Sequence, residues 1–274
     1  LMSLEMQKFM GKLCFQEMHL FQIKNFIRQV VSLKKYEIVK DNFKEIYGIK
    51  VYRIRALKDI ENRHQNIKAG DLGGYVQSER NLSQNNNCWI FDDAIVFDNA
   101  NVIQNANICD HAQISDNAII MGYATIMGHS KICDHAKIGG RALIAERAEI
   151  DENAQVWDSV CVGDHAHIFG NAVLERSVIV TGDAGICGNA ELLDSNDFVT
   201  LTGFGLTHNT ITFFRTKEEI YVNFCGYHGV SIKEFRHKIA ASHNHDIELE
   251  YCAKELEMLC DLMEYHFNKK TVND

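Results

Sequence analysis

An all-β solenoid is the fold class that this sequence predicts, and three observations on residues 88–195 predict it. The segment consists of eighteen hexads in a row, without an insertion. Every hexad has Ile, Val or Leu at its third position, and fourteen of the eighteen have alanine two residues earlier. The last two positions are mostly Asp, Gly, Asn or His. A short fixed period indicates identical structural units stacked on one another.

Each hexad has the pattern of a short strand followed by a turn. Side chains alternate between the two faces of a strand, so the alanine and the branched residue point the same way. Both positions are almost always apolar, so they face the interior, where alanine fits near a corner and the larger side chain fills the middle. Gly, Asn, Asp and His tolerate the positive φ angles of tight turns.

The segment before the repeat predicts a helical arm followed by a small β cap. Apolar residues recur near helical spacing over residues 5–35, which predicts an amphipathic helix within an N-terminal arm, residues 1–46. Residues 47–87 form the predicted β cap. Alternation over residues 47–57 indicates one or two strands there, and the glycine-rich stretch 69–74 is typical of a turn.

The segment after the repeat, residues 196–274, predicts an α+β cap. Residues 210–214 and 219–224 have the pattern of a β-hairpin. A capping box opens a predicted helix over residues 231–241, and a second helix is predicted over residues 246–267. An open end of a solenoid is an exposed sheet edge, so a cap of this kind is needed at both ends.

The hexad pattern resembles the hexapeptide repeat of left-handed parallel β-helices. Three hexads close one triangular coil in such folds, so the resemblance implies about six left-handed coils. The segments AGDLGGYVQSERNLSQNNNCWIFDDA and ITFFRTKEEIYVNFCGYHGVSIKEF resemble the flanks of YdcK-like hexapeptide-repeat proteins of bacteria and prophages. This likeness spans roughly residues 51–267. It implies an accessory role in a bacterium or phage, and a transferase activity only by analogy of fold.

Charge and cysteine usage narrow the choice of compartment and partner. The net charge is −9, with +7 over residues 1–58 and −11 over the repeat. An acidic rod is not expected to bind nucleic acid directly. The nine cysteines include no CxxC pair, which indicates reduced thiols in a cytoplasmic protein and neither a disulfide framework nor a zinc site. No apolar run reaches the length of a transmembrane segment.

One corner of the predicted coils carries candidate catalytic histidines. If eighteen residues make one coil, residues eighteen apart stack about 4.8 Å from each other. The column is Asp93, His111, His129, Arg147, His165 and Asp183. Histidine can act as a general base, so His111, His129 and His165 are candidates. His135 at another corner is a further candidate, and His167 lies outward on a neighbouring face. Histidine is also an ordinary turn residue in such repeats. No metal site is predicted, although His243 and His245 leave incidental metal binding open.

Two further features predict an interaction surface. The acids Asp98, Asp116, Asp134 and Glu152 stack in register, and a solvated edge is the ordinary alternative. One side of the rod presents mainly apolar residues outward, among them Trp89, Phe91, Met127 and Leu143. An apolar stripe of this kind needs a cover, which we expect to be the C-terminal helix or another subunit.

Two functions from different classes follow. The first is a non-catalytic accessory protein of a bacterium or phage. It would be a rigid acidic scaffold that needs no cofactor and binds a protein partner. Interference with a host defence complex is one role of this kind. The absence of an extruded loop within the repeat favours it. The alternative is an acyltransferase that uses acetyl-CoA and a histidine general base at a subunit interface. A homo-oligomer, either a dimer or a trimer, is expected under both.

Overall fold

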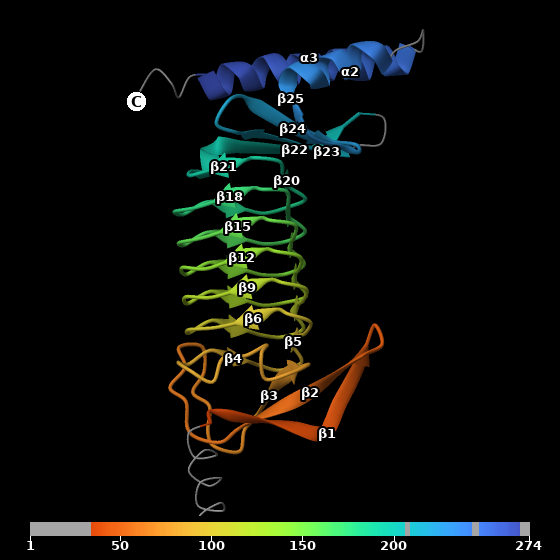
Figure 1. Ribbon diagram of the computed structural model, residues 1–274. Coiled ribbons are helices and arrows are strands. Elements are labelled where there is room, and N and C mark those ends of the chain that lie inside the picture. The colour runs from red at the N-terminus through yellow and green to blue at the C-terminus, as the bar shows by residue number, and fades with distance from the viewer. Residues whose placement is uncertain (1–33, 206–208, 243–246, 269–274) are drawn as a thin grey trace, which may run out of the picture.

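The computed structural model describes residues 34–205, 209–242 and 247–268, and it contains a parallel β-solenoid of about seven turns (Figure 1). Two helices lie near the C-terminus, and the described chain is mostly β. The predicted fold class is therefore confirmed. The helix predicted over residues 5–35 lies outside the described residues, apart from Lys34 and Lys35.

Three sheets form the sides of the solenoid. The side that we call the polar face contains β5 (Ile95–Val96), β8 (Gln113–Ile114), β11 (Lys131–Ile132), β14 (Glu149–Ile150), β17 (His167–Ile168) and β20 (Gly185–Ile186). The apolar face contains β4 (Trp89–Ile90), β7 (Asn107–Ile108), β10 (Thr125–Ile126), β13 (Leu143–Ile144), β16 (Cys161–Val162) and β19 (Ile179–Val180). The third face contains β6 (Asn101–Val102), β9 (Ile119–Ile120), β12 (Lys137–Ile138), β15 (Gln155–Val156), β18 (Val173–Leu174) and β21 (Glu191–Leu192).

The interior of the rod is a column of aliphatic side chains. The branched residues of one coil, Ile132, Ile138 and Ile144, have no exposed surface, and the small residues two positions before them, Ser130, Ala136 and Ala142, are equally buried. Successive coils are joined by backbone hydrogen bonds, of which the bond from the Lys131 N–H to the Ala148 carbonyl, 3.0 Å, is typical. Buried aliphatic area and a continuous ladder therefore stabilise the same stack.

Acidic turn residues tie adjacent coils together. Asp110, Asp134 and Asp164 have positive φ angles of 57°, 53° and 54°, which aspartate tolerates because its short polar side chain bonds locally. The carboxylate of Asp110 accepts a hydrogen bond from the Gly128 N–H at 2.8 Å, eighteen residues later. Asp134 and Asp164 make the same bond to the next coil. These acids thus have a structural role at the corners.

The solenoid begins earlier than the sequence period predicts. Strand β3 (Leu72–Val76) pairs in parallel with β5, and Leu82 bridges to Val102. These partners are twenty residues apart, whereas the repeat has an eighteen-residue spacing. Two extra residues before Trp89 hide this first turn from a search for a strict period. The prediction of about six coils is therefore one turn short.

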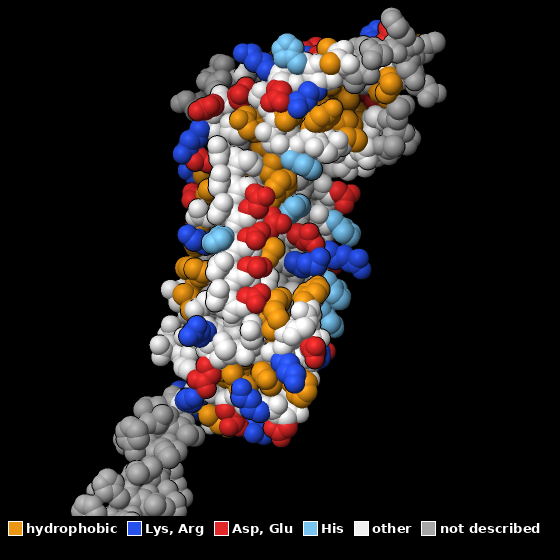
Figure 2. All heavy atoms as spheres, turned by 45° about the vertical axis from the view of Figure 1, so that its right-hand side comes forward, with side chains coloured by type: hydrophobic (Ala, Val, Ile, Leu, Met, Phe, Trp, Pro, Cys, Tyr) orange, Lys and Arg blue, Asp and Glu red, His pale blue; other side chains and the backbone are white. Residues whose placement is uncertain are grey.

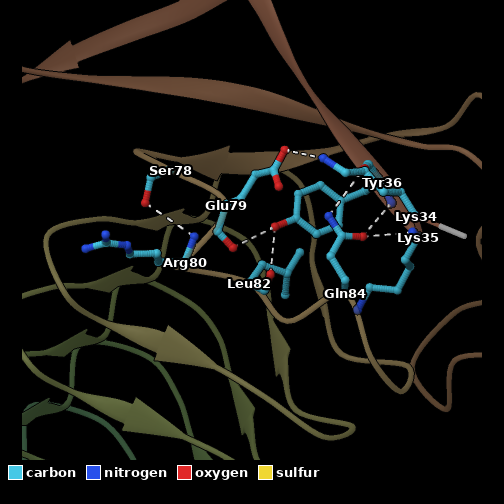
Figure 3. A network of polar contacts seen from close by, with 8 residues as sticks. All are labelled: Lys34, Lys35, Tyr36, Ser78, Glu79, Arg80, Leu82 and Gln84. Carbon is cyan, nitrogen blue, oxygen red and sulfur yellow. Dashed lines mark hydrogen bonds and ion pairs between the residues drawn. The ribbon is translucent and has the colours of Figure 1, made fainter. Parts of the chain in front are cut away.

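The N-terminal end is closed by a network around Tyr36, shown in Figure 3. The Tyr36 hydroxyl donates to the Leu82 carbonyl at 2.6 Å, and the side chain of Gln84 accepts the Lys35 N–H at 2.8 Å. The buried Lys35 ammonium donates to the Cys88 carbonyl at 2.8 Å. Burial is the main cause that lowers the pKa of Lys35. Backbone groups at this open end are therefore satisfied by side chains.

A long hairpin covers the start of the polar face (Figure 1). It consists of β1 (Tyr36–Ile46) and β2 (Ile49–Ala56), and β2 also pairs with β3. Val51 packs with Tyr75, Ile95 and Phe97 in a separate apolar cluster. The assignment of residues up to 46 to a helical arm is therefore wrong, because residues 36–46 form a strand that pairs antiparallel with β2.

The C-terminal end carries a four-stranded antiparallel sheet and two helices (Figure 1). The elements after the short helix η1 (Ser195–Asp197) are β22 (Phe198–Phe204), β23 (Asn209–Arg215), β24 (Ile220–Phe224), β25 (Tyr227–Ser231), α2 (Ile232–Ser242) and α3 (Ile247–Asn268). The predicted hairpin corresponds to β23 and β24, and both helices lie close to their predicted bounds. The outer strands β22 and β25 were not predicted from the sequence.

Close stacking of the coils predicts a difference between two turn glycines. Gly140 and Gly182 have φ angles of +64° and +69°, but a Cβ at Gly140 would lie 2.4 Å from the Asp158 nitrogen, whereas nothing lies within 4 Å of one at Gly182. Replacement by alanine costs about 1–2 kcal/mol at either position for the left-handed angle. We expect Gly140→Ala to lose about 1–3 kcal/mol more, because the next coil must shift. Chemical denaturation of both variants measures this, and equal losses would contradict it.

Candidate functional site

The polar face concentrates titratable side chains between two corners of the rod. Figure 2 shows acidic side chains aligned along this face, with histidine and basic side chains toward its right-hand edge. Neighbouring strands pair in register, so Lys131 lies beside Glu149 and Glu149 beside His167. The Lys131 ammonium contacts the Glu149 carboxylate at 2.7 Å. Opposite charges on adjacent coils thus form cross-strand pairs.

A hollow of about 580 Å³ lies where this face meets the histidine corner. Its lining residues are His129, Lys131, Arg147, Glu149, His165 and His167. The parallel pairing of β11, β14 and β17 explains why these six residues lie together. It stacks the outward residue and the corner residue of three successive coils beside one another. The lining combines two permanent cations with three imidazoles. It therefore offers donors for an anionic group and titratable nitrogens for proton transfer.

His167 is the histidine with the most developed surroundings. Its Nε2 lies 2.9 Å from Oδ2 of Asp151 on the preceding coil. The half-buried imidazole stacks on Phe169 with a centroid distance of 4.3 Å, and Phe169 meets the ring of His228 from the C-terminal cap edge-on. No hydrogen bond reaches the buried Oδ1 of Asp151 from any described residue. A carboxylate and a packed ring thus fix the orientation of His167.

The charge state of His167 is set by competing effects. Burial acts to lower the pKa of the imidazole, but the hydrogen bond and negative charge of Asp151 outweigh it, with a smaller contribution from Glu149. The net result is a raised pKa. An imidazole oriented by a carboxylate is an arrangement suited to a general base.

The structure places the three predicted catalytic histidines along one exposed corner. His111 and His129 stack with ring centroids 4.8 Å apart and an angle of 17° between the rings. His165 has its Nδ1 3.9 Å from the Asp183 carboxylate. His129 and His165 line the hollow, whereas His111 does not. The His167–Asp151 pair was missed as a pair, although a sixteen-residue separation already places the two on adjacent coils.

The other corner residues divide into structural and exposed groups. Asp93 pairs with Lys44 at 3.1 Å and with Arg53 at 3.3 Å, so it holds the β1–β2 hairpin. His135 belongs to a different corner, where its ring approaches the Asn117 amide at 3.5 Å.

The predicted acidic interaction surface is partly engaged in the fold. Asp98, Asp116, Asp134 and Glu152 all have positive φ angles of 50–56°. Asp116 accepts a hydrogen bond from the Ser115 hydroxyl at 2.7 Å, and Asp134 accepts one from the Glu152 N–H at 3.1 Å. The acids face solvent at one corner, but two of the carboxylates already serve the turns.

Two residues of the predicted apolar interaction surface are buried. Trp89 is 1% exposed and Phe91 is 7% exposed, so their assignment to a surface is wrong. Tyr36 meets the Trp89 ring edge-on at 6.3 Å, and His64 covers Phe91 at 4.9 Å. The N-terminal cap therefore covers this end of the apolar face. The sequence period cannot show this, because the covering residues lie outside the repeat.

Farther along the apolar face the outward side chains remain accessible. Leu143 is 36% exposed and Ile179 is 55% exposed, while Met127 is partly buried against the core. The expected cover by the C-terminal helix is absent, because the buried residues of α3 belong to a cluster with the four-stranded sheet and α2. A second hollow of about 320 Å³ lies between this face and the N-terminal cap. It is lined by Arg63, His64, Asn105, Asn107, Tyr123, Thr125, Arg141, Ala142 and Leu143.

Comparison with known families identifies the repeat. The family model described as bacterial transferase hexapeptide (six repeats) matches residues 111–146. The comparison with curated proteins found no match. Over these residues the chain is similar to that family, and the match agrees with the hexad period and with the β-solenoid of the structure. The match includes His111 and His129 but ends before His165 and His167.

Two further findings concern membranes and metals. Within residues 34–205, 209–242 and 247–268, no helix is long and apolar enough to cross a membrane. The same part of the chain holds no group of three or more His, Cys, Asp or Glu residues placed to bind a metal ion. His243 and His245, the incidental metal ligands considered above, lie outside the described residues.

The Asp151–His167 pair predicts a pH dependence of stability. A raised pKa of His167 means that the pair stabilises the fold below about pH 6.5, the ordinary histidine value, and that this contribution is lost as the pH rises through the folded pKa. We expect Asp151→Asn to remove the stabilisation that this pair gives at low pH and to lower the pKa of His167, because burial is then opposed only by the weaker effects of Glu149 and Glu152. Titration of the imidazole by NMR measures the pKa directly.

A matched control for this prediction is Asp116→Asn. Asp116 lies at the corner of the same face, two coils from Asp151. It is expected to leave the titration of His167 close to that of the unaltered protein. A His167 pKa at or below the ordinary value in the unaltered protein would contradict the prediction.

Proposed function

We propose that this chain is a non-catalytic binding protein, a rigid β-solenoid that presents a fixed surface to a protein partner. The observation that carries the proposal is the accessible part of the apolar face. Leu143 and Ile179 remain exposed although both ends of the rod are capped. Exposed apolar side chains aligned on a rigid face are typical of protein-interaction sites.

The regularity of the rod supports the same conclusion. The strands β4–β21 follow one another without an inserted loop, so the repeat itself builds no enclosed pocket. Both hollows described above are open depressions on its surface. A stack in which every coil is bonded to the next holds outward side chains in fixed rows, which reduces the entropy lost when a partner binds.

The flanking segments and the acidic corner indicate the kind of partner that we propose. The likeness of the flanking segments to YdcK-like proteins supports an accessory role in a bacterium or phage, in the cytoplasm. The acidic corner Asp98, Asp116, Asp134 and Glu152 favours a partner with a basic surface, because complementary charge speeds association. A component of a host defence complex is one partner of this kind.

Substitutions on the apolar face test the proposal. We expect Leu143→Asp and Ile179→Asp each to weaken capture of the partner about tenfold or more, because a carboxylate placed in an apolar contact loses its hydration. Affinity capture from cells that produce the protein, with quantification of what is retained, measures this. Gln155→Asp on the third face introduces the same charge as a control and is expected to retain the partner. Equal retention by all three variants would contradict an interaction through this face.

The His167–Asp151 pair favours a second candidate, an acyltransferase that uses acetyl-CoA. Under this alternative the hollow would receive the acceptor, and an imidazole would take a proton from its hydroxyl or amine. His167 is better oriented for this role than His111, His129 or His165, because Asp151 and Phe169 hold its ring. Lys131 and Arg147 supply positive charge for the phosphates of a bound coenzyme.

Acetyl-CoA binding distinguishes the two candidates. A ligand that binds only the folded state raises its melting temperature. The scaffold function predicts no shift at millimolar acetyl-CoA, and the acyltransferase predicts a shift of several degrees together with turnover that His167→Gln abolishes. His111→Gln, outside the hollow, serves as the matched control. A shift with turnover that depends on His167 would overturn the non-catalytic function.

A further inference from the structure

The C-terminal helix α3 has two apolar stripes, of which the fold uses only one. The inner stripe packs against the four-stranded sheet and α2. It consists of Ala253, Leu256, Cys260, Met263 and Phe267, all buried. The spacing of three and four residues is that of one continuous helix face. This stripe explains how α3 is held, and it leaves the opposite side of the helix free.

The outer stripe consists of large apolar side chains that face solvent. Tyr251, Met258, Leu262 and Tyr265 are 73%, 59%, 53% and 68% exposed. At 3.6 residues per turn these four positions fall within one narrow stripe on the side of α3 opposite the inner stripe. They account for four of the most exposed large hydrophobic residues among those described. Their alignment on one helix face makes this a coherent patch.

The position of α3 leaves this stripe accessible. Figure 1 shows α2 and α3 lying across the C-terminal end of the rod, beyond the four-stranded sheet. The inner stripe packs toward that sheet, so the outer stripe points away from the rod. Arg236 of α2 holds the two helices together through Asp261 at 2.8 Å and Glu264 at 3.1 Å. The outer stripe is therefore presented on a well-supported helix.

The two tyrosines of the outer stripe lie symmetrically about Met258. Met258 lies at the middle, with a tyrosine seven residues before it, Tyr251, and another seven residues after it, Tyr265. Two copies of α3 packed antiparallel around a two-fold axis at Met258 would place each Tyr251 opposite the Tyr265 of the other copy. A self-complementary patch is what an isologous interface requires.

Charge supports the same partner. Lys254 and Asp261 lie on one flank of the outer stripe, at nearly equal distances from Met258. In the antiparallel pair each Lys254 would lie near Asp261 of the second copy, as charged flanking residues do in coiled coils. The helix otherwise carries mainly acids, including Glu250, Glu255 and Glu257. An acidic surface of this kind is repelled by anionic lipid, which disfavours a membrane as the occupant.

We propose that the outer stripe of α3 binds a second copy of this chain and forms a two-fold, end-to-end dimer. The dimer joins two rods at their C-terminal ends and leaves the polar, apolar and third faces of both open. It does not depend on the proposed partner binding, since different residues carry it. A single helix pair is a small interface, so the association is reversible and depends on concentration.

A charge at the two-fold axis tests the proposal. Met258→Glu places two carboxylates opposite each other, and because Met258 is largely exposed the fold of each copy is retained. We expect the full chain to form a dimer as its concentration rises, and Met258→Glu to raise the dissociation constant about tenfold or more with an unchanged melting temperature. Sedimentation velocity over a concentration series measures the dissociation constant, and thermal denaturation at a concentration where both proteins are monomeric measures the melting temperature. Ile179→Glu, a similarly exposed residue on the apolar face, is the matched control and is expected to dimerise normally.

Each alternative outcome overturns the proposal. A chain that stays monomeric through the concentration range has no such interface. A trimer, or an oligomer that Ile179→Glu disrupts and Met258→Glu does not, places self-association on the side of the rod. An oligomer that neither variant affects would show that α3 is not the interface between the copies.

Cysteine cross-linking tests the orientation of the helices. In a background with the exposed Cys225 replaced by serine, an antiparallel pair predicts a disulfide between a Tyr251→Cys chain and a Tyr265→Cys chain when the two are mixed. Each variant alone is expected to cross-link at the level of the Cys225→Ser background. Efficient cross-linking of Tyr251→Cys with itself would indicate parallel helices and overturn the two-fold arrangement at Met258.

Discussion

The eighteen-residue register between coils is the constraint on which the rest of the structure depends. Each coil is bonded to the next through backbone N–H groups that reach carbonyls seventeen residues later, as between Cys133 and Ile150 at 3.1 Å. A slip of one residue would turn every buried aliphatic side chain outward. The same register places outward residues in fixed rows. The surface chemistry of the rod is therefore determined by which residue types recur at intervals of eighteen, and the pair made by Lys131 and Glu149 is one result.

The period predicts the solenoid because both residue types in the repeat have only one suitable environment. A branched side chain such as Ile132 fits the interior, and an acid such as Asp134 fits a turn with positive φ. The period fails where the chain departs from it. Two extra residues before Trp89 hid the first turn, and residues 36–46 gave no signal strong enough to distinguish an edge strand from a continuation of the helical arm.

The candidate site could be predicted in part, for a geometric reason. Residues eighteen apart were expected to stack, which correctly placed His111 beside His129 and His165 on the same corner. Asp151 and His167 are sixteen residues apart, which is one coil of eighteen residues less two. A column of residues eighteen apart therefore does not contain both members of this pair. Burial of Trp89 depended on the cap, whose contacts no repeat pattern contains.

The two ends of the rod solve the problem of an open sheet edge in different ways. At the N-terminal end, Lys35 and Tyr36 are buried and donate directly to carbonyls of the first turns. At the C-terminal end, a separate sheet with its own apolar core is added, and α3 covers that core. A helix that serves as the outermost layer has one side to pack and one side to leave in water. Because the outer side of α3 carries aromatic and aliphatic residues where a solvated face requires polar ones, capping alone does not explain its sequence.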